Sequence, residues 1–255
     1  MYRINVFGQA TALQSRNQQT MLGVALDSFE LCLILNSVLV FGASLRSPKN
    51  SGGQNASYIP YLAQVPSTLS ALVVVTADGA VFAAGDSDYR FAIESISKVA
   101  TLALALEDVG PAVMQDKVGA DPTGLAFNSV MALELHGGKP QSPLVNAGAM
   151  SSVSLIKGDT AELRWQRILQ MQRALTGSDI ELSDEVNTSE QTTNFHNRAI
   201  AWLLYADGTL YADPMQVVDV YTRQCSTLIT TVDLATMAAT LAARGRNPVT
   251  GQQWF

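Results

Sequence analysis

The chain has 255 residues, enough to bury one large core or two small ones. Apolar residues make up 47% and charged residues 15%, which excludes an intrinsically disordered chain. The net charge of −6 argues against binding to a nucleic-acid backbone, which requires a clustered basic face. Two histidines and two cysteines are too few for a histidine-rich metal site or a disulfide framework. What remains is hydrolytic or binding chemistry that uses hydroxyls, carboxylates, amides and lysines.

Residues 1–51 differ in character from the rest of the chain, and residues 31–45 form an uncharged apolar run. This run is shorter than the roughly 20 residues that a membrane-spanning helix needs. A buried or poorly ordered segment and a membrane-associated segment both stay open, although we expect no membrane partner. We predict an atypical N-terminal segment at 1–51 and one domain at 52–255.

A β-hairpin is the first regular structure predicted in that domain. Residues 71–76 and 80–84 are apolar and rich in valine and alanine, and Asp78-Gly79 supplies the turn between them. Two strands alone do not make a stable sheet, so partner strands are expected elsewhere. Because many helices follow this hairpin, the fold class is predicted to be α+β.

The helices are predicted from their periodicity and from the residues that end them. Gly110-Pro111 is expected to end the first helix, and Trp165, Ile168 and Trp202 are expected to lie in the core. The predicted helices span residues 95–109, 146–156, 160–175, 197–205, 214–221 and 231–243.

Ser95 and Lys98 stand three residues apart at the start of the first helix, so their side chains point in similar directions. An amine beside a hydroxyl is one way to activate a serine nucleophile without a histidine. Burial would lower the pKa of Lys98 and allow it to act as a neutral base. The alternative is a serine that caps the helix, either Ser95 or Ser97, followed by a solvent-facing lysine.

Polar residues elsewhere in the chain are suited to bind a zwitterion. If residues 190–197 are helical, the Glu190 carboxylate and the amides of Asn194 and Asn197 share one face. Asn146 lies among small residues, where a ligand can approach the backbone. Each also fits a capping or turn role, and Tyr58 and Tyr221 each fit a core or interface role.

Taken together, these residues resemble the serine-dependent glutaminase family of bacteria over about residues 52–248. The order and spacing of the matching segments are more specific than any single motif. The segments are Gly53-Gln-Asn-Ala-Ser-Tyr-Ile-Pro60, Gly85-Asp-Ser-Asp-Tyr-Arg-Phe91, Glu94-Ser-Ile-Ser-Lys98, Leu144-Val-Asn-Ala-Gly-Ala149, Ser189-Glu-Gln-Thr-Thr-Asn-Phe-His-Asn197 and Tyr221-Thr-Arg-Gln-Cys-Ser226.

The resemblance implies a β-lactamase or penicillin-binding-protein-like fold and hydrolysis of L-glutamine to L-glutamate and ammonia, with no cofactor and no metal. It implies that Ser95 is the nucleophile and Lys98 the base. The substrate-contacting positions that it implies are Tyr58, Ser95, Asn146, Glu190, Asn197 and Tyr221. It also implies a cytoplasmic homo-oligomer, and the ammonia released would take up protons and help a cell resist acid.

Two departures from the family pattern give further expectations. Residues 1–51 do not resemble what precedes the domain in the family. Family members also continue beyond a position like Phe255, through strands that add a tyrosine and an oxyanion-hole N–H. Because the loss of one such donor costs on the order of 10²–10³ in rate, we expect the chain as written to be inactive or weak. Another serine–lysine amidase, a β-lactam-binding protein and a non-catalytic fragment are the alternatives.

Overall fold

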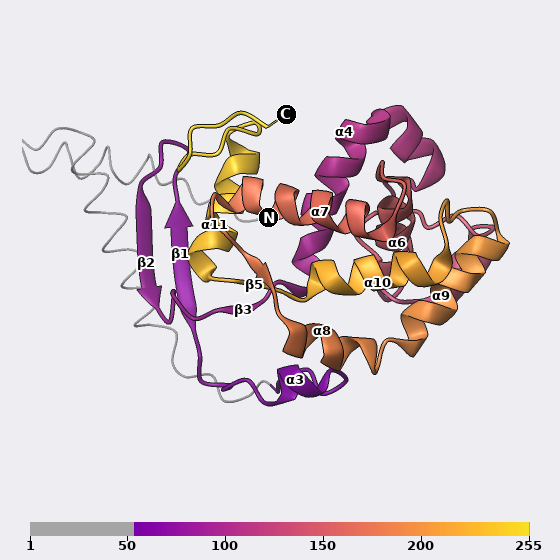
Figure 1. Ribbon diagram of the computed structural model, residues 1–255, viewed down its shortest axis with the longest axis horizontal. Coiled ribbons are helices and arrows are strands. Elements are labelled where there is room, and N and C mark those ends of the chain that lie inside the picture. Colours follow the sequence, from indigo (N-terminus) through magenta and orange to yellow (C-terminus); the bar gives the residue numbers. More distant parts are fainter. Residues whose placement is uncertain (1–53, 255) are drawn as a thin grey trace, which may run out of the picture. The chain divides into compact units, whose positions relative to one another are not determined.

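A computed structural model of the chain describes residues 54–254, all of which belong to one compact unit (Figure 1). The apolar run at 31–45 and the rest of segment 1–51 lie outside the described residues, as does Cys32. The boundary expected at residue 52 therefore stays a prediction.

Helices that pack closely on one another make up most of the described unit. The long helix α4 (Ser97–Lys117) packs against α6 (Asn146–Leu155) and α7 (Ala161–Thr176). Helix α10 (Pro214–Cys225) packs against α6, α7 and α9 (Phe195–Ala206). Their contacts enclose a core of fully buried aliphatic side chains, among them Met150, Ile168, Leu175 and Leu204. The helices are α3 (Pro60–Ala63), η1 (a 3₁₀ turn, Glu94–Ile96), α4 (Ser97–Lys117), α5 (Val130–Leu135), α6 (Asn146–Leu155), α7 (Ala161–Thr176), α8 (Asp184–Gln191), α9 (Phe195–Ala206), α10 (Pro214–Cys225) and α11 (Thr231–Ala242).

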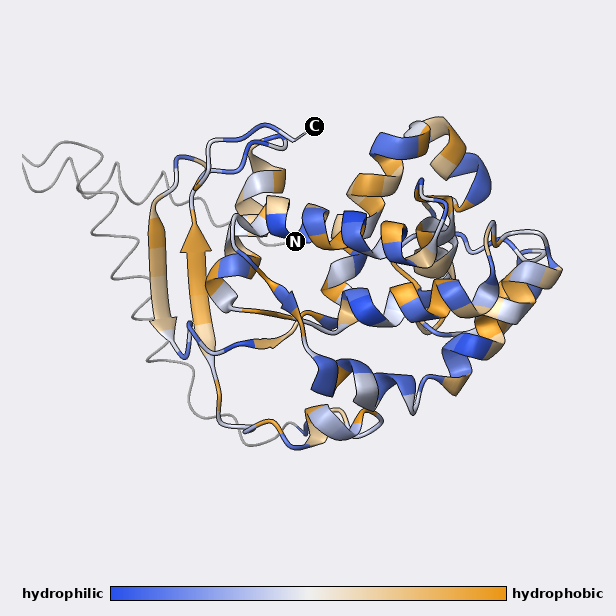
Figure 2. Ribbon diagram, viewed as in Figure 1, coloured by the Kyte–Doolittle hydropathy of each residue, from blue (hydrophilic) through white to orange (hydrophobic). Residues whose placement is uncertain are grey.

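The predicted hairpin is confirmed as β1 (Ala71–Val75) paired antiparallel with β2 (Val81–Gly85). Gly79 in the turn has φ +95°, a conformation that favours glycine. Both strands are hydrophobic over their length (Figure 2). Within residues 54–254 this sheet has no third strand, and α11 packs against β1 instead. Covering by a helix gives the hairpin the hydrophobic support that two strands lack on their own.

A second small sheet, which the sequence did not reveal, joins three distant segments. It contains β3 (Phe91–Ala92), β5 (Thr227–Ile229) and β4 (Glu181–Leu182), with β5 in the centre. The Ile93 amide extends the pairing and donates to the Thr227 carbonyl at 2.9 Å. The sheet therefore fixes the chain just before the Ser95 segment against the residues that follow α10.

The prediction for the end of the first helix was wrong. Gly110 leaves the helical region with φ +81° and ψ 162°, but the chain returns to a helix at Pro111 and continues to Lys117. Proline is tolerated at the start of the new segment because an N–H there would lack an intrahelical partner anyway. Gly110-Pro111 therefore kinks α4 rather than ending it.

The other helices follow the prediction more closely, with one error in the core. Trp165 and Ile168 are buried as expected, whereas Trp202 is 52% exposed. Trp202 stacks edge-on against Tyr205 on the outer face of α9. The prediction that Trp202 lies in the core was wrong. The apolar pattern of a helix does not show which of its faces is covered by a neighbouring element.

Candidate active site

The start of α4 places an exposed serine one turn before a buried lysine. Ser95 lies in η1 and is exposed, while Lys98 is only 3% exposed. Ile96 occupies the N-cap position of α4 without a side-chain hydrogen bond. Ser97 is instead buried, with its hydroxyl 3.6 Å from the Cys225 sulfur. The alternative of a capping serine with a solvent-facing lysine is therefore wrong.

The Lys98 amine is held by two oxygen acceptors. It donates to Asn146 Oδ1 at 2.7 Å and to the Leu144 carbonyl at 3.3 Å. Burial lowers the pKa of Lys98, and the nearby Cys225 opposes that shift. The cause is desolvation, because removal from water disfavours the charged form of an amine. The structure thus has the buried amine that the sequence suggested.

Asn146 is the centre of a polar network that joins four helices. Besides Lys98 of α4, its Oδ1 accepts a hydrogen bond from the Tyr221 hydroxyl of α10 at 3.1 Å. Its Nδ2 donates to Asn197 Oδ1 of α9 at 2.9 Å. Asn146 itself begins α6, and it is 7% exposed. A buried amide with both ends used in this way fixes the relative positions of the side chains around it.

Tyr221 connects this network to Ser95. Burial raises the pKa of the Tyr221 hydroxyl well above its usual value, and Cys225 and Glu190 add to the rise. A hydrogen bond with the Ser95 side chain acts in the opposite direction and lowers that pKa. Tyr221 therefore stays neutral, and its hydroxyl lies beside both Ser95 and Asn146.

Glu190 reaches the same region, although the condition for a shared helix face is not met, because residues 190–197 do not form one helix. Helix α8 ends at Gln191, and α9 begins at Phe195 after a break at residues 192–194. Asn194 lies in that break and donates its amide to Gln191 and Thr222. Its side chain is thus used to join α8 to α10, so it does not share a helix face with Glu190.

Glu94 is a site residue that the sequence analysis missed. Its side chain hydrogen-bonds Glu190, so two carboxyl groups meet immediately before Ser95. Glu94 adopts φ +51°, which is uncommon for a residue other than glycine and often marks functional sites. The available signal was its place in the segment Glu94-Ser-Ile-Ser-Lys98.

Burial shifts both carboxyl groups towards their neutral forms. It raises the pKa of Glu190 to about 9, with a further rise from the charge and hydrogen bond of Glu94. Burial also raises the pKa of Glu94 to about 7, although the hydrogen bond with Glu190 opposes the shift. The two carboxyl groups therefore share a proton at neutral pH.

Tyr58 stands next to the carboxyl pair and is 68% exposed. Partial burial raises the pKa of its hydroxyl, and the charges of Glu94 and Glu190 contribute. The Tyr61 amide donates to the Ser189 hydroxyl at 3.0 Å, which ties this segment to α8. The structure thus gathers the predicted site residues around the start of α4, with the exception of Asn194.

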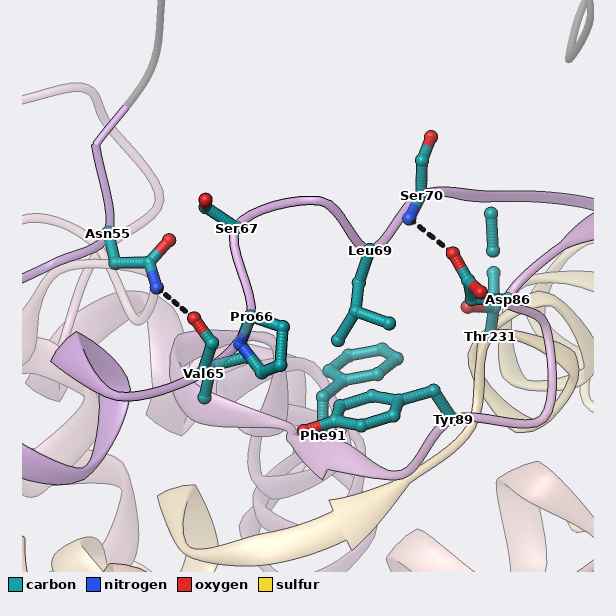
Figure 3. A pocket seen from close by; sticks show the side chains of 11 residues that line it. Asn55, Val65, Pro66, Ser67, Leu69, Ser70, Asp86, Tyr89, Phe91 and Thr231 are labelled. Carbon is teal, nitrogen blue, oxygen red and sulfur yellow. Dashed lines mark hydrogen bonds between the residues drawn. The ribbon is translucent and has the colours of Figure 1, made fainter. Parts of the chain in front are cut away.

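Two surface cavities lie away from this cluster. One, of about 290 Å³, lies beside Tyr89 and Phe91, where the Ser70 amide donates to Asp86 and the Asn55 amide to Val65 (Figure 3). These polar groups already have protein partners, and the aromatic rings of Tyr89 and Phe91 also line the cavity. The other, of about 590 Å³, lies between α7 and Trp254. Neither cavity is lined by Ser95, Lys98, Glu94 or Glu190, so the candidate active site is the Ser95 cluster.

No helix among residues 54–254 is long and apolar enough to cross a membrane. In the same range, no three or more histidine, cysteine, aspartate and glutamate side chains are grouped so as to bind a metal ion.

Comparison with known proteins identifies the relatives of this chain. The model of the glutaminase family matches residues 53–255. The chain belongs to the glutaminase family. Glutaminase 1 of Shigella flexneri is 72% identical to it over 200 residues, which are 78% of this chain and 64% of that protein.

Solved structures of glutaminases agree with this assignment. The probable glutaminase ybaS is 63% identical and has a TM-score of 0.82, over 89% of this chain and 72% of that one. The crystal structure of Mglu in its glutamate form is 30% identical and has a TM-score of 0.74, over 87% of this chain and 49% of that one. The predicted α+β, β-lactamase-like fold is confirmed by these neighbours.

The chain spans between 64% and 69% of the length of the first curated glutaminases that it matches.

Proposed function

We propose that this protein hydrolyses L-glutamine to L-glutamate and ammonia, with Ser95 as the nucleophile. One observation supports this more than any other: an exposed hydroxyl follows a buried carboxyl pair and stands one helical turn before a buried amine of lowered pKa. The hydroxyl with the nearby amine suits attack on an amide, and the carboxyl pair suits the cationic end of an amino acid.

The hydrogen bonds of Lys98 support its role as the base. A neutral amine has two N–H donors and one lone pair. In this structure two acceptors, Asn146 Oδ1 and the Leu144 carbonyl, take those donors. The lone pair is then left to receive the proton of the Ser95 hydroxyl as its oxygen attacks.

The reaction proceeds in two stages. The Ser95 oxygen forms a bond to the side-chain amide carbon of glutamine, and its proton moves to the Lys98 nitrogen. The carbon–nitrogen bond then breaks, and Lys98 returns the proton to the departing ammonia. Water attacks the resulting glutamyl ester, which releases glutamate and restores the Ser95 hydroxyl.

The remaining predicted residues are proposed to bind the amino-acid end of the substrate. Glu190 pairs with the ammonium group, and Asn146 and Asn197 offer amide donors to the carboxylate, with Tyr58 and Tyr221 beside them. Such a site rejects amides that lack these groups, because its buried polar atoms would be left unpaired. A crystal structure of the relative Mglu is described as its glutamate form, which supports the proposal that the present chain also binds an amino acid.

Three broader features of the proposal come from the family resemblance. The protein is proposed to act in the cytoplasm, to form a homo-oligomer and to help a cell resist acid through the ammonia it releases. None of these features requires a cofactor or a metal ion.

Ammonia release tests the proposed activity. The purified protein is incubated with L-glutamine, and ammonia is measured for the wild type, Ser95→Ala and the control Ser67→Ala, which lies in an exposed loop. In keeping with the weak activity expected from the sequence, we expect slow release from the wild type and from Ser67→Ala, and none from Ser95→Ala. No release from the wild type would contradict the activity, and undiminished release from Ser95→Ala would exclude this nucleophile.

A further inference from the structure

The pairing of Glu94 with Glu190 has a consequence for how substrate binds, and this inference rests on the function proposed above. Both side chains keep one oxygen, Oε1, that is buried without a hydrogen-bond partner within residues 54–254. Glu190 as a whole is 8% exposed. Buried carboxyl oxygens without partners are costly unless a ligand or a proton satisfies them.

The two carboxyl groups come from elements that the fold holds together. Glu94 lies in η1 and Glu190 near the end of α8, and both η1 and α8 pack against α10. Glu94 has an uncommon backbone conformation and begins a tight 3₁₀ turn, immediately before Ser95. The pair therefore lies directly beside the proposed nucleophile, where the amino-acid end of the substrate is expected.

The neighbouring ionisable groups do not supply a cation to the pair. Burial raises the pKa values of Tyr221 and Cys225 on α10, and that of Tyr58 before α3, so these three groups stay neutral. Two other ionisable groups already have hydrogen-bond or ion-pair partners of their own. The Lys98 amine of α4 is bound to Asn146 and Leu144, and Asp219 of α10 is paired with Arg223 at 2.9 Å.

We propose that Glu94 and Glu190 act as one acid pair, which holds a proton when the site is empty and releases it to solvent when the substrate's ammonium group binds. The proton and the ammonium group have the same role, since each is a positive charge that the two carboxyl groups share. One charge replaces another, and the oxygens that lack partners gain N–H donors. Glu94 is then a specificity residue for the ammonium group, alongside Glu190.

The sign of the pH dependence follows from this exchange. A bound cation stabilises the ionised carboxylates, so it lowers the pKa of the pair and binding releases protons. Reciprocally, a fall in pH must weaken binding. Where about one proton leaves with each ligand bound, the apparent affinity falls about tenfold for each unit of pH.

Calorimetry measures the proton directly. L-glutamate is titrated into the purified protein at pH 8, between the two pKa values, where the empty pair holds one proton. The titration is repeated in several buffers, and the slope of the observed heat against the ionisation enthalpy of the buffer gives the protons released. We expect the wild type to release close to one proton per ligand. Glu94→Gln is expected to release clearly less, because the remaining carboxyl no longer has a charged neighbour. The control Glu185→Gln changes an exposed carboxyl group of α8, the helix that carries Glu190, and should behave like the wild type.

The outcomes separate the two proposals. Heats that are independent of the buffer, or Glu94→Gln that releases as many protons as the wild type, would overturn the acid pair while leaving an amino-acid site intact. No binding of L-glutamate at any pH would instead contradict the proposed function itself, and the acid pair with it.

Discussion

The role of Lys98 as a neutral base can be tested by placing a carboxylate where Asn146 Oδ1 now lies. Asn146→Asp is nearly isosteric, and the new carboxylate would replace an amide oxygen that is 2.7 Å from the Lys98 nitrogen. It would still accept from Tyr221. The amide of Asn197 can rotate so that it donates to the carboxylate, so the network keeps its connections.

The magnitude follows from the charge that is introduced. An opposite charge at this distance shifts a pKa by about 1 to 3 units towards the charged form. If the Lys98 pKa rises by that amount, the neutral fraction at a pH below it falls by about 10- to 1000-fold, since each unit is a factor of ten. Activity at neutral pH should fall accordingly and recover as the pH is raised.

The assay is the pH dependence of ammonia release at limiting L-glutamine for the wild type, Asn146→Asp and Asn197→Asp. Asn197 contacts Asn146 but has no hydrogen bond to Lys98, so its variant is the matched control for an added carboxylate. We expect the limb of the profile that reports the base to move upward by about 1 to 3 units in Asn146→Asp and by less in Asn197→Asp. An unmoved limb in Asn146→Asp would refute the reasoning, because it would mean that the ionisation of Lys98 does not limit the rate.

Two further predictions concern stability and packing. The Glu94–Glu190 pair binds more protons in the folded protein than in the unfolded chain between pH 4.5 and about 9, because burial raises the pKa values of both groups. The contribution of this pair to stability should therefore fall as pH rises through this range. Thermal unfolding should show that Glu94→Gln raises the Tm more at pH 8 than at pH 4.5, and an equal change at both pH values would contradict the shifted pKa values. Gly148→Ala would place its Cβ 1.8 Å from the Ser142 carbonyl oxygen, so the loop before Asn146 must move. We expect a loss of about 1 to 3 kcal/mol in the free energy of unfolding, measured in urea, together with reduced activity. Gly124→Ala is the control for activity. Its φ of +66° also strains an alanine and lowers stability, but nothing lies within 4 Å of the added atom, so activity should be unchanged.

Local patterns in the sequence predicted the elements that local forces determine. The Asp78-Gly79 turn marked the hairpin, and the apolar spacing around Trp165 and Ile168 marked a helix with a buried face. The burial of Lys98 was also predictable, because apolar residues surround it in the helix. These features depend on residues only a few positions apart.

Other features depended on contacts between distant segments and could not be predicted. The break at 192–194 is stabilised by Asn194, which bonds Thr222 of another helix. The strand β5 pairs with β3, which precedes it by more than a hundred residues. Glu94 joined the site only because the fold brings Glu190 to it, and a glutamate before a serine has no distinctive local pattern. Helix propensity also could not distinguish a kink at Gly110 from an end.

The most direct test of the account is to trap the glutamyl ester. The protein is mixed with L-glutamine, quenched in acid during turnover and digested, and the modified peptide is located by mass spectrometry. The account predicts a glutamyl group on Ser95 in the wild type and no modified serine in Ser95→Ala. Ammonia release accompanied by a glutamyl group on Ser97, or on no residue of the segment 94–98, would contradict it.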